Sequence, residues 1–222
     1  MYFHNRAEAG RLLADELIDY RLKNCSVVAL TPGAVIVGAQ IAMRIHAGLM
    51  ILLTENLFLP GEIDALGAVS SSNMLTYNDM FSTGQIEEFV SEYFTYIEQQ
   101  RMEKLSKLHR LLGTGGEIKR ELLHNHIVIV VSDGLSNGFS LAVAAEFLKP
   151  IKIKKLVAAS TVASTQAVDR MHLFADEIHN LSVVNNFMDT NHYYEDNTIP
   201  DIEGVFKIIR DTPIRWDRRA SR

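Results

Sequence analysis

Several residue types and patterns are scarce in this chain, and each scarcity excludes a class of protein. The 222 residues include a single cysteine, Cys25, which excludes an internal disulfide and fits a reducing compartment. No apolar run approaches the roughly 20 residues that span a bilayer, and the longest, Ala47–Leu53, has only the length of a strand. The first residues lack a basic stretch followed by an apolar core, so we expect no secretory signal. These features predict a cytoplasmic protein with no membrane partner.

An excess of basic residues is also missing. Asp and Glu number 27 against 22 Lys and Arg, which gives a formal net charge of −5. Proteins that bind nucleic acids through the phosphates normally carry a positive net charge, so we expect no nucleic-acid partner. An apolar content of 47% with 22% charged residues is instead typical of a globular domain.

Strand-like and helix-like segments alternate along most of the chain. This alternation predicts an α/β fold with a central, mainly parallel sheet and helices on both faces. The expected strands are Ser26–Leu30, Leu49–Thr54, His126–Ser132, Lys152–Ser160 and Glu177–Leu181. The expected helices are Arg6–Tyr20, Ala34–Ile45, Gln85–Leu112, Phe139–Leu148 and Thr165–Phe174.

One section interrupts the alternation. Glu55–Asn73 contains a Pro-Gly pair and a short apolar run, which we interpret as loop, short strand and turn before the long helix. We therefore predict one domain over residues 1–211 with an insertion, or hood, at about 55–123, and a basic tail over 212–222. The apolar side chains within Phe89–Ile97 are compatible with core packing or with a homodimer contact.

The segment His126–Ser140 carries the strongest local signal for chemistry. An Ile- and Val-rich strand ends in a polar, Gly-containing turn that leads into a helix. Unpaired amides and the helix dipole at such a helix start favour a bound phosphate. The turn Thr31-Pro32-Gly33 follows another strand of the same predicted sheet, so both turns should face one crevice at the carboxyl ends of the strands. The alternative is a plain strand-to-helix connection.

Two further side-chain types allow catalytic or metal-binding interpretations. Cys25 directly precedes a buried strand, which favours an inert thiol over a nucleophile. His124 and His126 are two residues apart, and His172 and His179 seven, but the chain has neither HExxH nor a Cys-His metal spacing. The sequence therefore predicts no metal site built from these histidines.

Five motifs together resemble those of a known family. On these residues the chain resembles the type I phosphoribosyltransferases, and in particular the bacterial group described simply as predicted phosphoribosyltransferases. The motifs are Phe3 with Asn5-Arg6 and Glu8-Ala9-Gly10; Thr31-Pro32-Gly33-Ala34-Val35; Pro60-Gly61-Glu62 with Leu66-Gly67-Ala68-Val69; Ser132–Ser140; and Tyr194-Glu195-Asp196.

The resemblance implies an activity and assigns residues to it. It implies transfer of ribose 5-phosphate from phosphoribosyl pyrophosphate (PRPP) to a nitrogen nucleophile with the help of Mg²⁺, and it makes Asp133 the catalytic acid on the ribose. The residues that would bind the ribose and its 5′-phosphate are Ser132, Asp133, Gly134, Leu135, Ser136, Asn137, Gly138, Phe139 and Ser140. Those of the pyrophosphate turn are Thr31, Pro32, Gly33 and Ala34, and further pocket candidates are Glu55, Asn56 and Glu62.

The chain also departs from the family pattern. Ser132 replaces the first of two paired acids, Asn137 a threonine, and Pro32 an arginine, while Glu55-Asn56-Leu57 stands where the group has R-K-L. Losing cations near the leaving pyrophosphate would cost several kcal/mol, a rate factor on the order of 10² or more. We expect binding of phosphate, PRPP, ribose 5-phosphate or a nucleoside monophosphate with weak or lost transferase activity. The alternative is an active Mg²⁺-dependent transferase for an unidentified nitrogen acceptor.

Overall fold

The computed structural model describes residues 2–113, 118 and 120–212. The chain forms two compact units, one of Met1–Ile51 with Ile118–Arg222 and one of Leu52–Glu117. The basic segment predicted at the end of the chain falls, from residue 213 on, outside the described residues.

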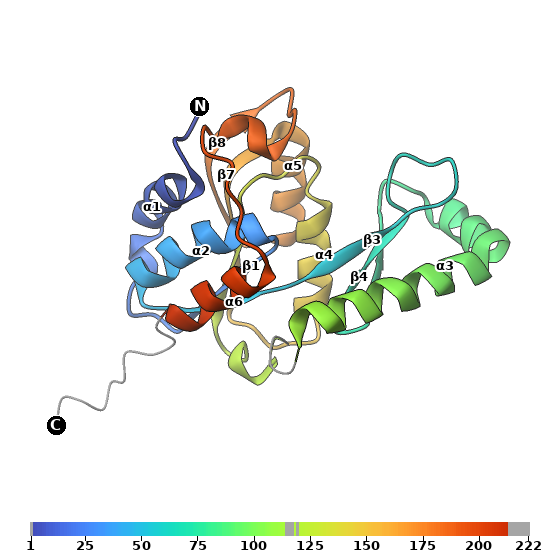
Figure 1. The fold of residues 1–222 in the computed structure, drawn as a ribbon, viewed down its shortest axis with the longest axis horizontal. Helices are drawn as coiled ribbons and strands as arrows, with labels where there is room; N and C mark the ends of the chain where they lie inside the picture. Colours follow the sequence, from blue (N-terminus) through green and yellow to red (C-terminus); the bar gives the residue numbers. More distant parts are fainter. Residues whose placement is uncertain (1, 114–117, 119, 213–222) are drawn as a thin grey trace. The chain divides into compact units, whose positions relative to one another are not determined.

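A five-stranded parallel sheet forms the centre of the first unit (Figure 1). The parallel α/β architecture predicted from the sequence is thereby confirmed. Both β1 and β6 are buried along their whole length, as expected for strands covered on both faces. The strands, in the spatial order β2-β1-β6-β7-β8, are Gly48–Ile51, Cys25–Ala29, Ile127–Ser132, Lys155–Ser164 and Glu177–Val184.

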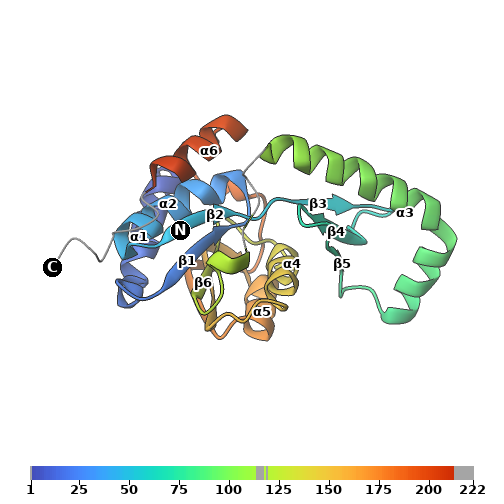
Figure 2. The ribbon, with the colours of Figure 1, turned by 90° about the horizontal axis from the view of Figure 1, so that it is seen from below.

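Helices cover both faces of this sheet. Figure 2 shows α1, α2 and α6 on one face and α4 and α5 on the other. These helices are α1 Arg6–Glu16, α2 Pro32–Ile45, α4 Phe139–Leu148, α5 Thr165–Phe174 and α6 Ile202–Asp211. Short 3₁₀ turns occupy η1 Ile18–Tyr20, η2 Arg120–Leu122 and η3 Thr190–Tyr193.

The second unit contains a small antiparallel sheet and one long helix. The strands β3 Thr54–Leu57, β4 Gly67–Ser70 and β5 Leu75–Tyr77 pair in this order, and α3 spans Thr83–Leu112 with a kink at Tyr93. Apolar side chains of Phe89–Ile97 pack on the hydrophobic core of the second unit, which includes Leu57, Leu59 and Leu66. This confirms the packing interpretation for part of that face, whereas Phe94 is 60% exposed.

Several predicted boundaries are wrong, for local reasons. The strand predicted over Leu49–Thr54 is two strands, because β2 ends at Ile51 and Thr54 opens β3 of the other sheet. The first helix ends at Glu16 instead of Tyr20, since Leu17 leaves helical geometry and a 3₁₀ turn follows. The strand predicted over Lys152–Ser160 is shifted to Lys155–Ser164, where small buried residues continue the pairing with β8.

The sequence analysis predicts neither the strand β5 nor the helix α6. Only three residues form β5, which pairs with β4 alone.

Among the helices in the described ranges, none combines the length and apolar character that crossing a bilayer requires.

Candidate functional site

Asp133 lies at the centre of a buried polar cluster at the carboxyl end of the sheet. It directly follows β6, and its side chain is 5% exposed. Arg6 Nε donates to its Oδ2 at 2.6 Å, and Thr31 Oγ1 donates to its Oδ1 at 2.7 Å. The two turns that the sequence places in one crevice therefore do meet, through the carboxylate of Asp133.

Arg6 provides the positive charge in this cluster. Its side chain is 1% exposed, and its guanidinium carbon lies 4.4 Å from the ring centroid of Tyr194. Nη2 donates to Asn191 Oδ1 at 2.7 Å, whereas Nη1 is buried without a partner among the described residues. A buried guanidinium requires a nearby anion, and Asp133 is that anion.

The segment after β8 completes the cluster. Tyr194 Oη donates to the backbone carbonyl of Asp133 at 2.7 Å and lies 2.5 Å from Thr161 Oγ1. Burial raises the pKa of the Tyr194 phenol, so the ring stays neutral beside the Arg6–Asp133 pair. Phe3 pairs with Tyr194 through a parallel bridge, so the segment before α1 lies beside the segment that follows η3.

The turn Thr31–Ala34, hereafter the 31–34 turn, offers few free donors. Thr31 caps α2 by accepting the Ala34 amide on Oγ1 at 2.9 Å, and Pro32 has no amide proton. Gly33 lies so close that a Cβ there would be 2.1 Å from Oδ2 of Asp133. Within the described ranges no peptide bond is cis, so the peptide between Thr31 and Pro32 is trans.

The segment Ser132–Ser140, hereafter the phosphate loop, is held from behind by α5. Ser164 Oγ donates to the Ser136 carbonyl at 2.5 Å, and Arg170 Nη1 donates to the Asn137 carbonyl at 2.9 Å. Arg170 is 8% exposed, and burial lowers the pKa of its guanidinium. These contacts turn two carbonyls of the loop toward α5.

Several backbone amides of the phosphate loop have no acceptor among the described residues. Leu135 N donates to Val162 O, and Phe139 N donates to Oδ1 of Asn137. Within the part of the chain that the structure describes, four other backbone amides have no acceptor on the protein: those of Ser136, Asn137, Gly138 and Ser140. Gly138 adopts φ +74° at the start of α4, a conformation that glycine accepts without strain. Together these features fit an anion at the helix start.

At the start of the loop, Ser132 and Gly134 form hydrogen bonds with each other. Ser132, which replaces the first motif acid, donates its hydroxyl to the Gly134 carbonyl at 2.9 Å and accepts the Gly134 amide at 3.2 Å. Ser132 is 2% exposed. Its hydroxyl therefore stabilises the turn and contributes no charge.

Sequence reasoning missed two supporting residues, Ser164 and Arg170. Ser164 carried a usable signal, because a serine directly before a predicted helix is a common N-cap, and it does accept the Ala167 amide. Arg170 lies within the predicted helix Thr165–Phe174 and nothing in its spacing points to the phosphate loop. Arg6 and Tyr194 entered the sequence argument only as parts of motifs, without roles.

Three predicted pocket residues lie in the second unit: Glu55, Asn56 and Glu62. Glu55 forms ion pairs with Lys104 at 3.4 Å and Lys107 at 2.5 Å. Burial raises the pKa of Glu55, but these two lysines outweigh it, so the net shift is downward. The acidic charge that the sequence shows at Glu55 is therefore neutralised within its own unit.

The structure allows a test of whether the site suits the Mg²⁺ that the resemblance implies. Magnesium prefers octahedral oxygen ligands and is usually held by one or two carboxylates. Here both Asp133 oxygens already accept protein hydrogen bonds, one of them from a cation. The residues at this site do not fit magnesium.

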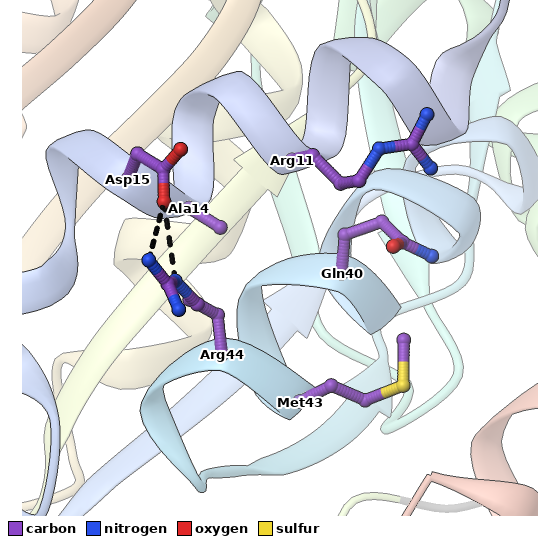
Figure 3. A pocket seen from close by; sticks show the side chains of 6 residues that line it. All are labelled: Arg11, Ala14, Asp15, Gln40, Met43 and Arg44. Carbon is purple, nitrogen blue, oxygen red and sulfur yellow. Dashed lines mark hydrogen bonds and ion pairs between the residues drawn. The ribbon is translucent and has the colours of Figure 1, made fainter.

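A cavity of about 470 Å³ lies apart from this cluster, between α1 and α2 (Figure 3). Arg44 pairs there with Asp15 at 3.0 Å, while Arg11 and Gln40 extend together on the other side. Both members of the Arg44–Asp15 pair are more than half exposed. Solvent therefore screens the Arg44–Asp15 pair, whereas the pair of Arg6 and Asp133 is buried.

No protein-family model matches the chain. Two curated proteins of Mycobacterium tuberculosis, from the CDC 1551 and H37Rv strains, are each 25% identical over 177 residues. They are named "Putative phosphoribosyl transferase MT0597" and "Putative phosphoribosyl transferase Rv0571c". The matches cover 79% of this chain but only 39% of the length of each relative.

One solved structure is similar along its whole length. The crystal structure of TT1426 from Thermus thermophilus aligns with a TM-score of 0.75 at 27% identity, covering 96% of this chain and 99% of that one. The names of the curated relatives confirm the resemblance to phosphoribosyltransferases that the sequence motifs predict.

Proposed function

We propose that this chain is a phosphoribosyltransferase-type protein that binds a phosphorylated sugar or nucleotide at the phosphate loop and has weak or lost transferase activity. The names of its curated relatives support the phosphoribosyltransferase type. One observation carries the proposal on activity: the single remaining motif acid, Asp133, has both carboxylate oxygens engaged by Arg6 and Thr31.

Binding is supported by the donors of the phosphate loop. Four amides without acceptors among the described residues lie at or just before the start of α4, where the helix dipole adds positive potential. The guanidinium of Arg170 lies directly behind, bonded to the Asn137 carbonyl. Hydrogen bonds to an ionised phosphate are roughly twice as strong as neutral ones, so a mostly backbone site still holds an anion.

Transfer is disfavoured by the same geometry. The reaction would build positive charge on the ribose and negative charge on the departing pyrophosphate, and both require opposite charge nearby. Arg6 neutralises Asp133, which weakens the carboxylate's field on the ribose. At the 31–34 turn, Pro32 provides neither an amide proton nor a cation. Binding therefore survives changes that remove most of the stabilisation of the transition state.

The proposal is tested by measuring binding and turnover on the same sample. Ribose 5-phosphate binding is followed by calorimetry, and pyrophosphate release from PRPP is followed with Mg²⁺ and a panel of purine, pyrimidine and amine acceptors. We expect binding without turnover. Robust turnover that is lost in Asp133→Asn, with the fold intact by circular dichroism, would establish the active transferase instead. Absence of any affinity for ribose 5-phosphate would leave a purely structural role.

A further inference from the structure

We infer that the ligand of this site is a phosphomonoester taken up without magnesium, a pentose 5-phosphate or a nucleoside 5′-monophosphate, in preference to PRPP with Mg²⁺. The inference rests on the proposed function, since it assumes that the phosphate loop binds an anion. It differs from the family expectation, in which a pyrophosphate group and a magnesium ion contribute much of the affinity. Three features of the first unit support it.

First, the 31–34 turn has few hydrogen-bond donors for a second phosphate group. The Ala34 amide is spent on Thr31 Oγ1, the hydroxyl proton of Thr31 is spent on Asp133, and Pro32 has no amide. The Gly33 amide has no acceptor among the described residues, but it belongs to a residue packed on the Asp133 carboxylate, whose Oδ2 would lie 2.1 Å from a Cβ at this position. A pyrophosphate arriving at this turn would find few free amides, and the nearby guanidinium of Arg6 is buried and paired with Asp133.

Second, the position that would attract a divalent cation already holds a monovalent one. The Arg6 guanidinium lies on the Asp133 carboxylate in a nearly water-free environment. A Mg²⁺ ion would have to displace this hydrogen bond and then tolerate a buried like charge beside it. Because PRPP depends on metal to offset its pyrophosphate charge, an unfavourable metal site also disfavours PRPP.

Third, the monophosphate end is reinforced from a different element. Ser164 and Arg170 of the α5 region hold the Ser136 and Asn137 carbonyls away from the side on which the free amides lie. Donors fixed in advance cost little reorganisation when the ligand arrives. The guanidinium of Arg170 additionally raises the local positive potential behind the loop. The site is therefore organised for one phosphate group.

The decisive experiment compares ligands on the full chain by titration calorimetry. Ribose 5-phosphate, adenosine 5′-monophosphate and PRPP are each titrated with and without Mg²⁺. We expect a phosphomonoester to bind, its affinity to be unchanged by Mg²⁺, and PRPP with Mg²⁺ to bind no more tightly than that monoester. The better of the two monoesters then identifies the ligand as a sugar phosphate or a nucleotide.

The possible failures are distinguishable. PRPP with Mg²⁺ binding more tightly than the better monoester would overturn this inference while leaving the proposed function standing. No binding of any of the three compounds would overturn both. Binding of free pyrophosphate with Mg²⁺ in competition with ribose 5-phosphate would also contradict the inference, because the 31–34 turn would then bind a pyrophosphate group.

A set of variants tests the role of α5 in the same assay. Arg170→Met should lower the affinity for the bound monoester by about tenfold, since a charge-assisted contact behind the loop is lost. Arg170→Lys should restore part of it, and Arg11→Met, which removes an exposed arginine from the α1–α2 cavity, should have no effect. Amide spectra of the wild type should show the shifts on titration at Ser136, Asn137, Gly138 and Ser140. An unchanged affinity in folded Arg170→Met would exclude the positioning role.

Discussion

Arg6 and Asp133, which are 127 residues apart in the chain, form a buried ion pair of 2.6 Å between Nε and Oδ2. Their side chains are 1% and 5% exposed. The pair joins the start of α1 to the turn after β6, and so joins the first motif of the chain to the phosphate loop. The pair also engages Asp133, the remaining member of the two paired acids in the Ser132–Ser140 motif.

Removing one partner of this pair should destabilise the protein strongly. Arg6→Met leaves a buried carboxylate uncompensated, and we expect the free energy of unfolding to fall by about 3–5 kcal/mol. Urea denaturation measures this loss. Adding Asp133→Asn should recover part of it, because the unpaired charge is then removed.

The exposed pair of Arg44 and Asp15 is the matched control. Arg44→Met should cost less than about 1 kcal/mol, because solvent screens both partners. Equal losses at Arg6 and Arg44 would show that the buried pair has no special role in stability.

Gly33→Ala should be among the most damaging small substitutions in the chain. The new methyl group would lie 2.1 Å from Asp133 Oδ2 and 2.7 Å from Arg6 Nε, both of them buried. We expect a loss of about 1–3 kcal/mol from overpacking, measured as a lower urea midpoint. Gly84→Ala meets nothing within 4 Å in α3 and should be neutral or slightly stabilising. A neutral Gly33→Ala would mean that the turn moves apart from Asp133 freely.

Alkaline stability should depend on Cys25. Burial raises the pKa of its thiol from 9.0 to about 11. Between these two values the unfolded chain loses the proton while the native state keeps it, so the free energy of unfolding falls as pH rises. The contribution is roughly 2–3 kcal/mol, fully present below pH 9 and lost above pH 11.

Cys25→Ala isolates this effect from other groups that titrate at high pH. The variant should show a shallower fall in stability than the wild type between pH 9 and about 11 in urea titrations. Parallel curves for the two proteins would contradict the raised pKa. The wild-type thiol should also react slowly with a disulfide reagent until the protein unfolds, as expected for an inert cysteine.

Acid stability should depend on Glu177. The hydrogen bond from Lys155, with those from His179 and Tyr20, lowers the pKa of Glu177 from 4.5 to about 2. The unfolded chain takes up this proton first, so the stabilisation is present above pH 4.5 and is lost as pH falls toward 2. Because the side chain is 36% exposed, we expect no more than about 1 kcal/mol.

The comparison of Glu177→Gln with Glu146→Gln measures this contribution. Glu146 pairs with Lys149 on the surface of α4, and its side chain is 42% exposed. Only the Glu177 variant should flatten the acid limb of stability against pH. The same acid limb in both variants would rule out the Lys155–Glu177 contact as its source.

The sequence predicts the first unit well because strongly apolar strands alternate with clear helices there. The Ile- and Val-rich strand β6 and the Ala-rich helix α4 are examples, and the α4 bounds agree at both ends. The small sheet is largely missed because its strands are three or four residues long and gain their stability from α3. No local pattern encodes that kind of support.

The candidate site is predictable in place but not in its contacts. Two turns at the carboxyl ends of parallel strands imply a shared crevice, and Thr31 does reach Asp133. The pairing of Asp133 with Arg6 and of Asn137 with Arg170 depends on long-range packing of helices. A single sequence carries no signal for such pairs, so the acid looks available in the sequence when it is not.

The bridge between Phe3 and Tyr194 has a consequence for how the protein is made. The ribosome delivers α1 long before the segment around Tyr194, so the nascent chain carries Arg6 without its carboxylate, its aromatic neighbour or Asn191. Neither the cluster around Asp133 nor its closing strand segment can form while translation is upstream of residue 194. The buried cluster is thus completed only after residue 194 has been synthesised, and a chain released before that point lacks it.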